Sequence, residues 1–100
     1  MHEYVYLYCI VDKISGMHVT NPIPAMNDGV ALNGYIQFLK GEEEKGLARG
    51  MYRLLRIGEF HQNGVITADG ISIRVADGDN AETAFKEWCE VELAKERMEE

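Results

Sequence analysis

The opening part of the chain has the residue pattern of a β-strand. Residues 2–11 are rich in β-branched and aromatic side chains, which favour an extended backbone. Successive side chains of a strand point to opposite faces, and both faces here are apolar enough to be covered. One face carries Tyr4, Tyr6, Tyr8 and Ile10, and the other carries Val5, Leu7, Cys9 and Val11. The Ser15-Gly16 turn then predicts a short second strand at residues 17–20, which Pro22 and Pro24 end.

A second group of strands is predicted between residues 51 and 75. Residues 51–60 form the first of them, and Asn63-Gly64 is a dipeptide that tolerates the positive φ angles of a tight hairpin. Residues 65–67 form the return strand. Asp69-Gly70 then turns the chain again, and apolar and polar residues alternate over residues 71–75, as in a strand with one wet face. The three segments are expected to form a meander.

The residues after the first strands keep the spacing of an amphipathic helix. This helix is expected to begin at Asn27 or Asp28, whose short side chains can accept hydrogen bonds from the free amides of the first turn. Gly41, about 13 residues on, is expected to form a left-handed C-cap. Gly34 is expected to allow a close approach to the sheet.

A second helix is predicted at the end of the chain. Asp79 and Glu82 have the spacing of a capping box, and apolar residues follow at helical intervals before residues 95–100, which are expected to fray. The order of elements is therefore β-β-α-β-β-β-α. It predicts an α+β fold, in which two helices pack on one antiparallel sheet of about four to five strands, within a single domain of residues 1–100.

Composition agrees with one globular domain in a reducing compartment. Hydrophobic residues make up 46% of the chain and charged residues 27%, unlike a disordered sequence. Cys9 and Cys89 lie near opposite ends, without the spacing of a zinc site or a disulfide framework, which favours a cytoplasmic setting. The longest apolar run, residues 5–11, is too short to span a membrane, and no signal sequence opens the chain. No membrane partner is expected.

The residues with catalytic potential form no recognisable constellation. Catalysis needs a nucleophile or base with an orienting partner, or a metal with an open coordination position. His18 is expected in a polar turn or an edge strand and His61 at a hairpin tip, while both cysteines are expected to be inert thiols. The glutamates at residues 42–44 lack the alternating ligand positions of a calcium loop. The sequence therefore predicts a binding protein rather than an enzyme, with no cofactor and no metal.

Charge is segregated along the chain. The net charge of −7 argues against a protein that coats nucleic acid through bulk electrostatics. Residues 45–56 nevertheless contain four cations and no acid. Strict alternation places Tyr52, Arg56 and Phe60 on one face of their strand, where bases would stack on the rings and phosphates would meet guanidinium groups. The candidate nucleic-acid-binding residues are Lys45, Arg49, Tyr52, Arg53, Arg56 and Phe60.

Each of these features has an alternative. Tyr52 and Phe60 would also serve as core residues under a helix, with the arginines paired to nearby glutamates. The tyrosine face of Tyr4, Tyr6 and Tyr8 would pack in the core, form a dimer interface or stack on bases. Residues 82–100 contain seven acids and three cations, which would mimic nucleic-acid charge or bind a basic partner. A protein-binding or self-associating adaptor is therefore the alternative to a DNA-binding protein.

Residues 4–67 contain several short features in a characteristic order. They are an opening strand that ends at Asp12, a segment with Pro22, a helix start at Asn27-Asp28 followed by Ala31, and the sequence LLRIGEF at residues 54–60 before a glycine hairpin. In this order and spacing they resemble the small nonstructural protein of gokushovirus-type phages, the icosahedral single-stranded DNA phages of the Microviridae. The chain departs from that pattern at Asn33, where a basic residue is common, and at His61, where an aspartate is frequent. The acidic segment from Asp79 onward has no counterpart in it.

The resemblance implies a nonstructural phage protein that binds single-stranded DNA during viral genome replication or packaging, in the host bacterial cytoplasm. A homodimer and a phage or host replication protein are the other expected partners. Convergence of Arg49, Arg53 and Arg56 beside exposed rings would favour DNA binding. Pairing of each arginine with a carboxylate would oppose it.

Overall fold

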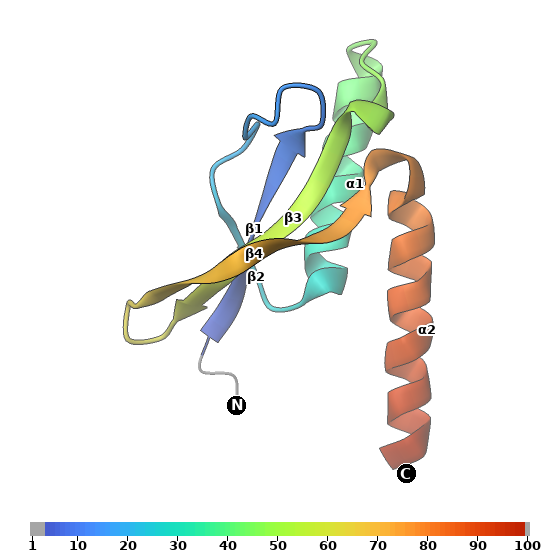
Figure 1. Cartoon of the computed structure of the whole chain (residues 1–100). Helices are drawn as coiled ribbons and strands as arrows, with labels where there is room; N and C mark the ends of the chain where they lie inside the picture. Colours follow the sequence, from blue (N-terminus) through green and yellow to red (C-terminus); the bar gives the residue numbers. More distant parts are fainter. Residues whose placement is uncertain (1–3, 100) are drawn as a thin grey trace.

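The computed structural model describes residues 4–99 and has an α+β architecture, with four antiparallel strands and two helices (Figure 1). The strands are β1 (Tyr4–Asp12), β2 (Ile23–Ala25), β3 (Tyr52–His61) and β4 (Ile66–Asp77), in the sheet order β2-β1-β3-β4. The helices are α1 (Asp28–Glu44) and α2 (Ala81–Glu99), and the 3₁₀ turns η1 (Arg49–Met51) and η2 (Gly78–Asn80) precede β3 and α2. The predicted fold class is confirmed. Residues 2 and 3 of the predicted first strand lie outside the described residues.

The second strand lies later in the chain than predicted. Residues 17–20 contribute an isolated bridge between His18 and Val11, while the strand that pairs with β1 is β2. Pro24, expected to end a strand, lies inside β2. A proline is tolerated there because β2 is an edge strand, where a missing amide hydrogen costs no ladder bond.

β3 and β4 form the predicted hairpin, and Gly64 in its turn has φ +90°. Residues 71–75, expected as the third strand of a meander, pair instead with β3 as part of β4. The pairing moves from Ala68 opposite Gly58 to Ile73 opposite Arg56, so the register shifts across residues 69–72. Asp69-Gly70 therefore lies at this irregularity within β4 rather than in a turn between two strands.

α1 begins where the sequence predicts and ends later. The Asn27 side chain caps the helix by accepting a hydrogen bond from the Val30 amide at 2.9 Å. Gly41 was expected to end the helix, but α1 continues to Glu44. The left-handed conformation falls on Gly46 instead, at φ +87°.

The close approach expected at Gly34 occurs at Gly29. Gly34 is exposed, and a Cβ atom added there would meet open space. A Cβ atom at Gly29 would lie within 2.7 Å of three atoms of the Trp88 ring. The position in α1 that has no room for a Cβ atom therefore lies against α2 and not against the sheet.

The capping box before α2 lies earlier than predicted. Asp77 and Asn80 form it, and the Asn80 side chain accepts a hydrogen bond from the Asp77 amide at 2.9 Å. Asp79 and Glu82 were predicted for this role, but Glu82 pairs with Arg49. α2 runs to Glu99, and the fraying expected over residues 95–100 stays a prediction.

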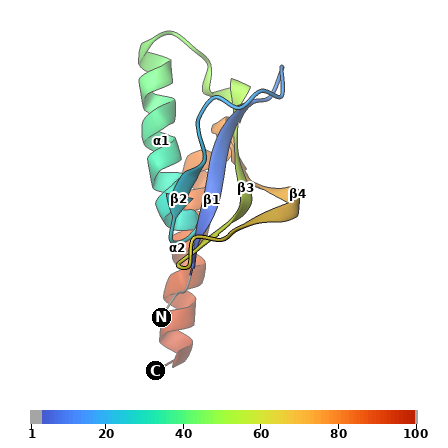
Figure 2. The same cartoon turned by 90° about the vertical axis from the view of Figure 1, so that its left-hand side faces the viewer.

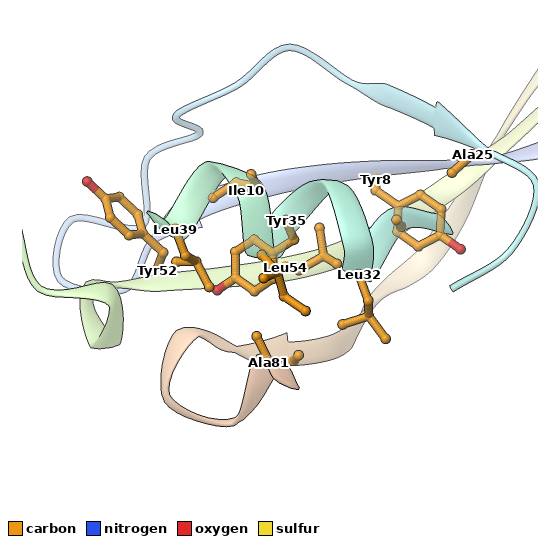
Figure 3. Packing of buried hydrophobic residues seen from close by; sticks show 12 residues of the cluster. Tyr8, Ile10, Ala25, Leu32, Tyr35, Leu39, Tyr52, Leu54 and Ala81 are labelled. Carbon is orange, nitrogen blue, oxygen red and sulfur yellow. The ribbon is translucent and has the colours of Figure 1, made fainter. Parts of the chain in front are cut away.

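The core lies between the sheet and α1 (Figure 3). Its almost fully buried members are Tyr8, Ile10, Leu54 and Ala76 from the sheet, Leu32, Tyr35 and Leu39 from α1, and Ala81 at the start of α2. Both helices lie on this inner face of the sheet (Figure 2). Leu7, Cys9 and Val11 are also buried but belong to no part of this cluster, because they point to the other side. No helix within residues 4–99 covers that outer face.

Candidate nucleic-acid interface

Tyr52 faces the helices rather than solvent. Its side chain is 6% exposed, and its ring packs edge-on against Phe38 with the ring centroids 5.1 Å apart. The hydroxyl donates a hydrogen bond to Glu42 at 3.2 Å, and burial together with this bond raises the pKa of Tyr52. Tyr52 is thus a core residue, and its ring is not available for stacking on a base.

Phe60 lies on the opposite face of the sheet from Tyr52 and Arg56. Leu7 pairs with Gly58 whereas Tyr8 pairs with Arg56, so Ile57 is an extra residue in β3. Such a β-bulge interrupts the alternation of side chains between the two faces. The prediction that Tyr52, Arg56 and Phe60 share one face is therefore wrong, because it assumed a regular strand.

Lys45 and Arg49 are paired with carboxylates near the end of α1. Lys45 lies 3.4 Å from Glu42. The Arg49 guanidinium joins two elements, since it lies 2.7 Å from Glu43 and 2.5 Å from Glu82 of α2. Hydrogen bonding to Arg49 holds the pKa of Glu82 below its usual value. Arg49 thus links α2 to α1, whereas Lys45 makes an exposed pair with α1 alone.

Arg56 and the tyrosine face lie on the inner side of the sheet. The Arg56 guanidinium carbon is 4.7 Å from the centroid of the Tyr6 ring, a cation–π distance. Tyr4 meets Tyr6 edge-on at 5.5 Å, and both are half-buried. Tyr8 is fully buried, and its hydroxyl donates a hydrogen bond to Asp28 at 2.6 Å. Of the three tyrosines proposed for an interface, Tyr8 is thus a core residue and is not available to a partner.

Arg53 belongs to a group of charges on the outer face. Its guanidinium donates a hydrogen bond of 2.6 Å to Asp77, the residue opposite it in β4. Lys13 lies 3.6 Å and Arg74 lies 3.9 Å from the same carboxylate. These cations, with Arg53 as the largest cause, hold the pKa of Asp77 below its usual value. We call Lys13, Arg53 and Arg74 the basic cluster.

Lys13 and Arg74 were not among the predicted site residues, because the pairing of distant strands decides that they lie near Arg53. Arg74 was placed on the wet face of a strand, which is correct, but nothing local shows that this strand returns to lie beside Arg53. Lys13 follows the end of β1 and reaches Asp77 across the sheet. Arg49, Arg53 and Arg56 lie in three separate places, so the convergence that would favour DNA binding does not occur. Arg49 and Arg53 are instead paired with carboxylates, which opposes DNA binding by these three arginines as a group.

An apolar depression lies on the outer face as well. It measures about 380 Å³. Its walls come from β1, β2, β3 and β4 and the residues before β2, and are formed by Leu7, Pro22, Pro24, Ile57, Gly58, Phe60, Ile66 and Ala68. Phe60 is the aromatic residue among them and is 43% exposed. We call this depression the apolar hollow.

The part of the chain that the structure describes contains no group of three or more His, Cys, Asp or Glu side chains placed to hold a metal ion. Neither α1 nor α2 is long and apolar enough to cross a membrane. Comparison with protein-family models, with curated proteins and with solved structures finds no match to the chain. The resemblance to the phage proteins therefore rests on the residues quoted for it.

Proposed function

We propose that this chain binds single-stranded DNA through the outer face of its sheet, as a phage nonstructural protein that acts in genome replication or packaging in the host bacterial cytoplasm. The basic cluster is the observation that carries the proposal. Three cations surround the single carboxylate of Asp77, which leaves a local excess of positive charge in a protein of net charge −7. The resemblance to gokushovirus-type proteins supports the same function.

The proposal changes the set of candidate residues. Arg53 and Phe60 remain, because both lie on the outer face, and Lys13 and Arg74 join them. Arg49 and Tyr52 are assigned to the packing of the fold, and Lys45 to an exposed ion pair with Glu42. Arg56 lies over Tyr6 on the inner face and is not needed by the outer-face site. Binding by a few cations should be weak and sensitive to salt. For single strands, the logarithm of the binding constant falls with the logarithm of the salt concentration, with a slope of about −0.7 for each phosphate contacted.

A labelled oligothymidylate titrated at several salt concentrations tests this function. The test variant is Lys13→Glu with Arg74→Glu, which keeps the Arg53–Asp77 pair that joins β3 to β4. The control is Lys86→Glu with Arg97→Glu, which changes the net charge equally at exposed positions of α2. We expect salt-dependent binding, with a slope near −2 for three phosphates, that the test variant abolishes and the control largely keeps. Equal losses in both variants, or no binding at low salt, would refute the proposal.

A second candidate function is protein binding by the end of α2. α2 extends beyond Trp88, which packs near the start of α1, and its remaining turns project away from the sheet (Figure 1). Exposed apolar residues on this part are Val91 (53%), Leu93 (52%) and Met98 (87%). Apolar side chains on an acidic helix suit a groove with a basic rim, either in a second copy or in another protein. A change in mass by light scattering that Val91→Glu with Met98→Glu reverses would favour this function.

A further inference from the structure

We infer that the apolar hollow is a nucleobase site, in which an unpaired base stacks on Phe60 while the phosphates of the same strand reach the basic cluster. The inference rests on the proposed DNA binding and adds what part of the DNA is recognised. A duplex hides its bases in the stack, so a base site of this kind would select single strands.

The bulge at Ile57 creates the site. By adding one residue to β3, it turns Phe60 from the inner face, which α1 and α2 cover, to the outer face, which they do not. Gly58 lies between Ile57 and Phe60 in β3, and a Cβ atom on it would come within 2.4 Å of the Thr67 carbonyl oxygen. The close pairing of β3 with β4 at the floor of the hollow therefore requires glycine.

The lining of the hollow is suited to a flat, weakly polar ring. No residue of the lining carries a charge, and the prolines at 22 and 24 give it rigid walls. Phe60 has no hydroxyl that would need a hydrogen-bond partner, and its exposed surface is available for stacking. Stacking on aromatic rings accepts every base, because every base has a π face.

The distance to the basic cluster suits a strand of DNA. Phe60 and Arg53 lie on the same face of β3 with one bulged residue between them, which at about 3.3 Å per residue places them roughly 20 Å apart. A single-strand-binding domain covers roughly 4–16 nucleotides, so one strand can reach both features.

Charge decides between DNA and a second copy of the chain as the occupant. The group around Asp77 has three cations for one carboxylate, and it lies on the face that holds the hollow. An apolar hollow beside excess positive charge complements a polyanion with apolar bases. A second copy would bring a chain that also has a net charge of −7, and like net charges repel.

Two oligomers of equal length distinguish the contribution of the bases to binding from that of the phosphates. One is oligothymidylate and the other carries abasic sites, so both present the same phosphates. The variants are Phe60→Leu, which keeps apolar bulk without a ring, and Phe60→Tyr, which keeps the ring. We expect the wild type and Phe60→Tyr to prefer oligothymidylate about tenfold, as base stacking would give, and Phe60→Leu to bind both oligomers with the affinity that the wild type has for the abasic one.

The outcomes distinguish the inference from the proposed function. Wild-type protein that binds neither oligomer overturns both. Wild-type protein that binds both oligomers equally, or Phe60→Leu that keeps the preference for bases, overturns the nucleobase site and leaves DNA binding by the basic cluster intact. A change in the mass of Phe60→Leu by light scattering, with no change in its preference for bases, would assign the hollow to a second copy and overturn the inference.

Discussion

Gly29 is a position at which α1 lies directly against the Trp88 side chain of α2. A Cβ atom there would lie 2.4 to 2.7 Å from the Trp88 ring, so Gly29→Ala must push the indole away. Trp88 is half-buried and packs against the core cluster together with Phe85. The substitution therefore tests whether α2 is held on the inner face, an arrangement in which neither α1 nor α2 covers the outer face.

Two opposing terms set the size of the effect. Overpacking costs about 1–3 kcal/mol, whereas alanine gains up to about 1 kcal/mol over glycine through helix propensity. The gain is smaller at Gly29, because this residue lies in the first turn of α1. We expect a net loss of about 1–2 kcal/mol, and each kcal/mol corresponds to about 4–8 °C in Tm for a domain of this size.

Gly34→Ala is the matched control. Gly34 lies in the same helix, and a Cβ atom there meets open space, so this substitution should stabilise the protein by about 0.5–1 kcal/mol. Urea unfolding can be followed by the fluorescence of Trp88, the only tryptophan. If Gly29→Ala were as stable as Gly34→Ala, Trp88 would not pack on Gly29 and the position of α2 would be wrong.

Three further predictions concern single side chains. Tyr8→Phe should lower the free energy of unfolding by about 1–2 kcal/mol, because it removes a hydrogen bond to the carboxylate of Asp28. Tyr35→Phe should cost no stability in the same urea experiment, since the Tyr35 hydroxyl is buried without a hydrogen-bond partner among the described residues. Because Arg53 lowers the pKa of Asp77 from its usual 3.8, the stability that this carboxylate adds is present above about pH 4 and is lost as the pH falls through the lower folded value. Unfolding by urea at pH 7 and near pH 2 should thus show Asp77→Asn less stable than the wild type only at pH 7. By adding one net positive charge to the basic cluster, the same variant should also bind oligothymidylate more tightly at low salt in an anisotropy titration, and weaker binding would contradict the proposed site.

Local signals in the sequence predicted the parts of the fold that depend on a few neighbouring residues. Asn27 caps α1 because its side chain reaches an amide only three residues away, and Gly64 forms the hairpin turn because it adopts a positive φ. β1 was recognisable from its β-branched and aromatic residues. The first strand, the central helix and the hairpin turn therefore required no knowledge of the rest of the chain.

The candidate site was harder to predict because it depends on pairing between distant segments. Arg49 and Glu82 are 33 residues apart, and Arg53 and Asp77 are 24 apart, so neither ion pair has a local signal. The bulge at Ile57 follows from the register of β1 against β3, and it alone decides on which face Phe60 lies. Counting alternate residues gave the correct face for Tyr52 and Arg53, which precede the bulge, and the wrong face for Phe60, which follows it.

Amide chemical shifts measured while oligothymidylate is added to the isotopically labelled protein test the proposed binding face most directly. If single-stranded DNA binds the outer face, the largest changes should fall on Lys13, Arg53, Arg74, Asp77 and the residues around Phe60, and raised salt should reverse them. The amides of α1 and of residues 89–99 should change little. Shift changes confined to α2, or none at saturating oligomer and low salt, would contradict DNA binding by this face.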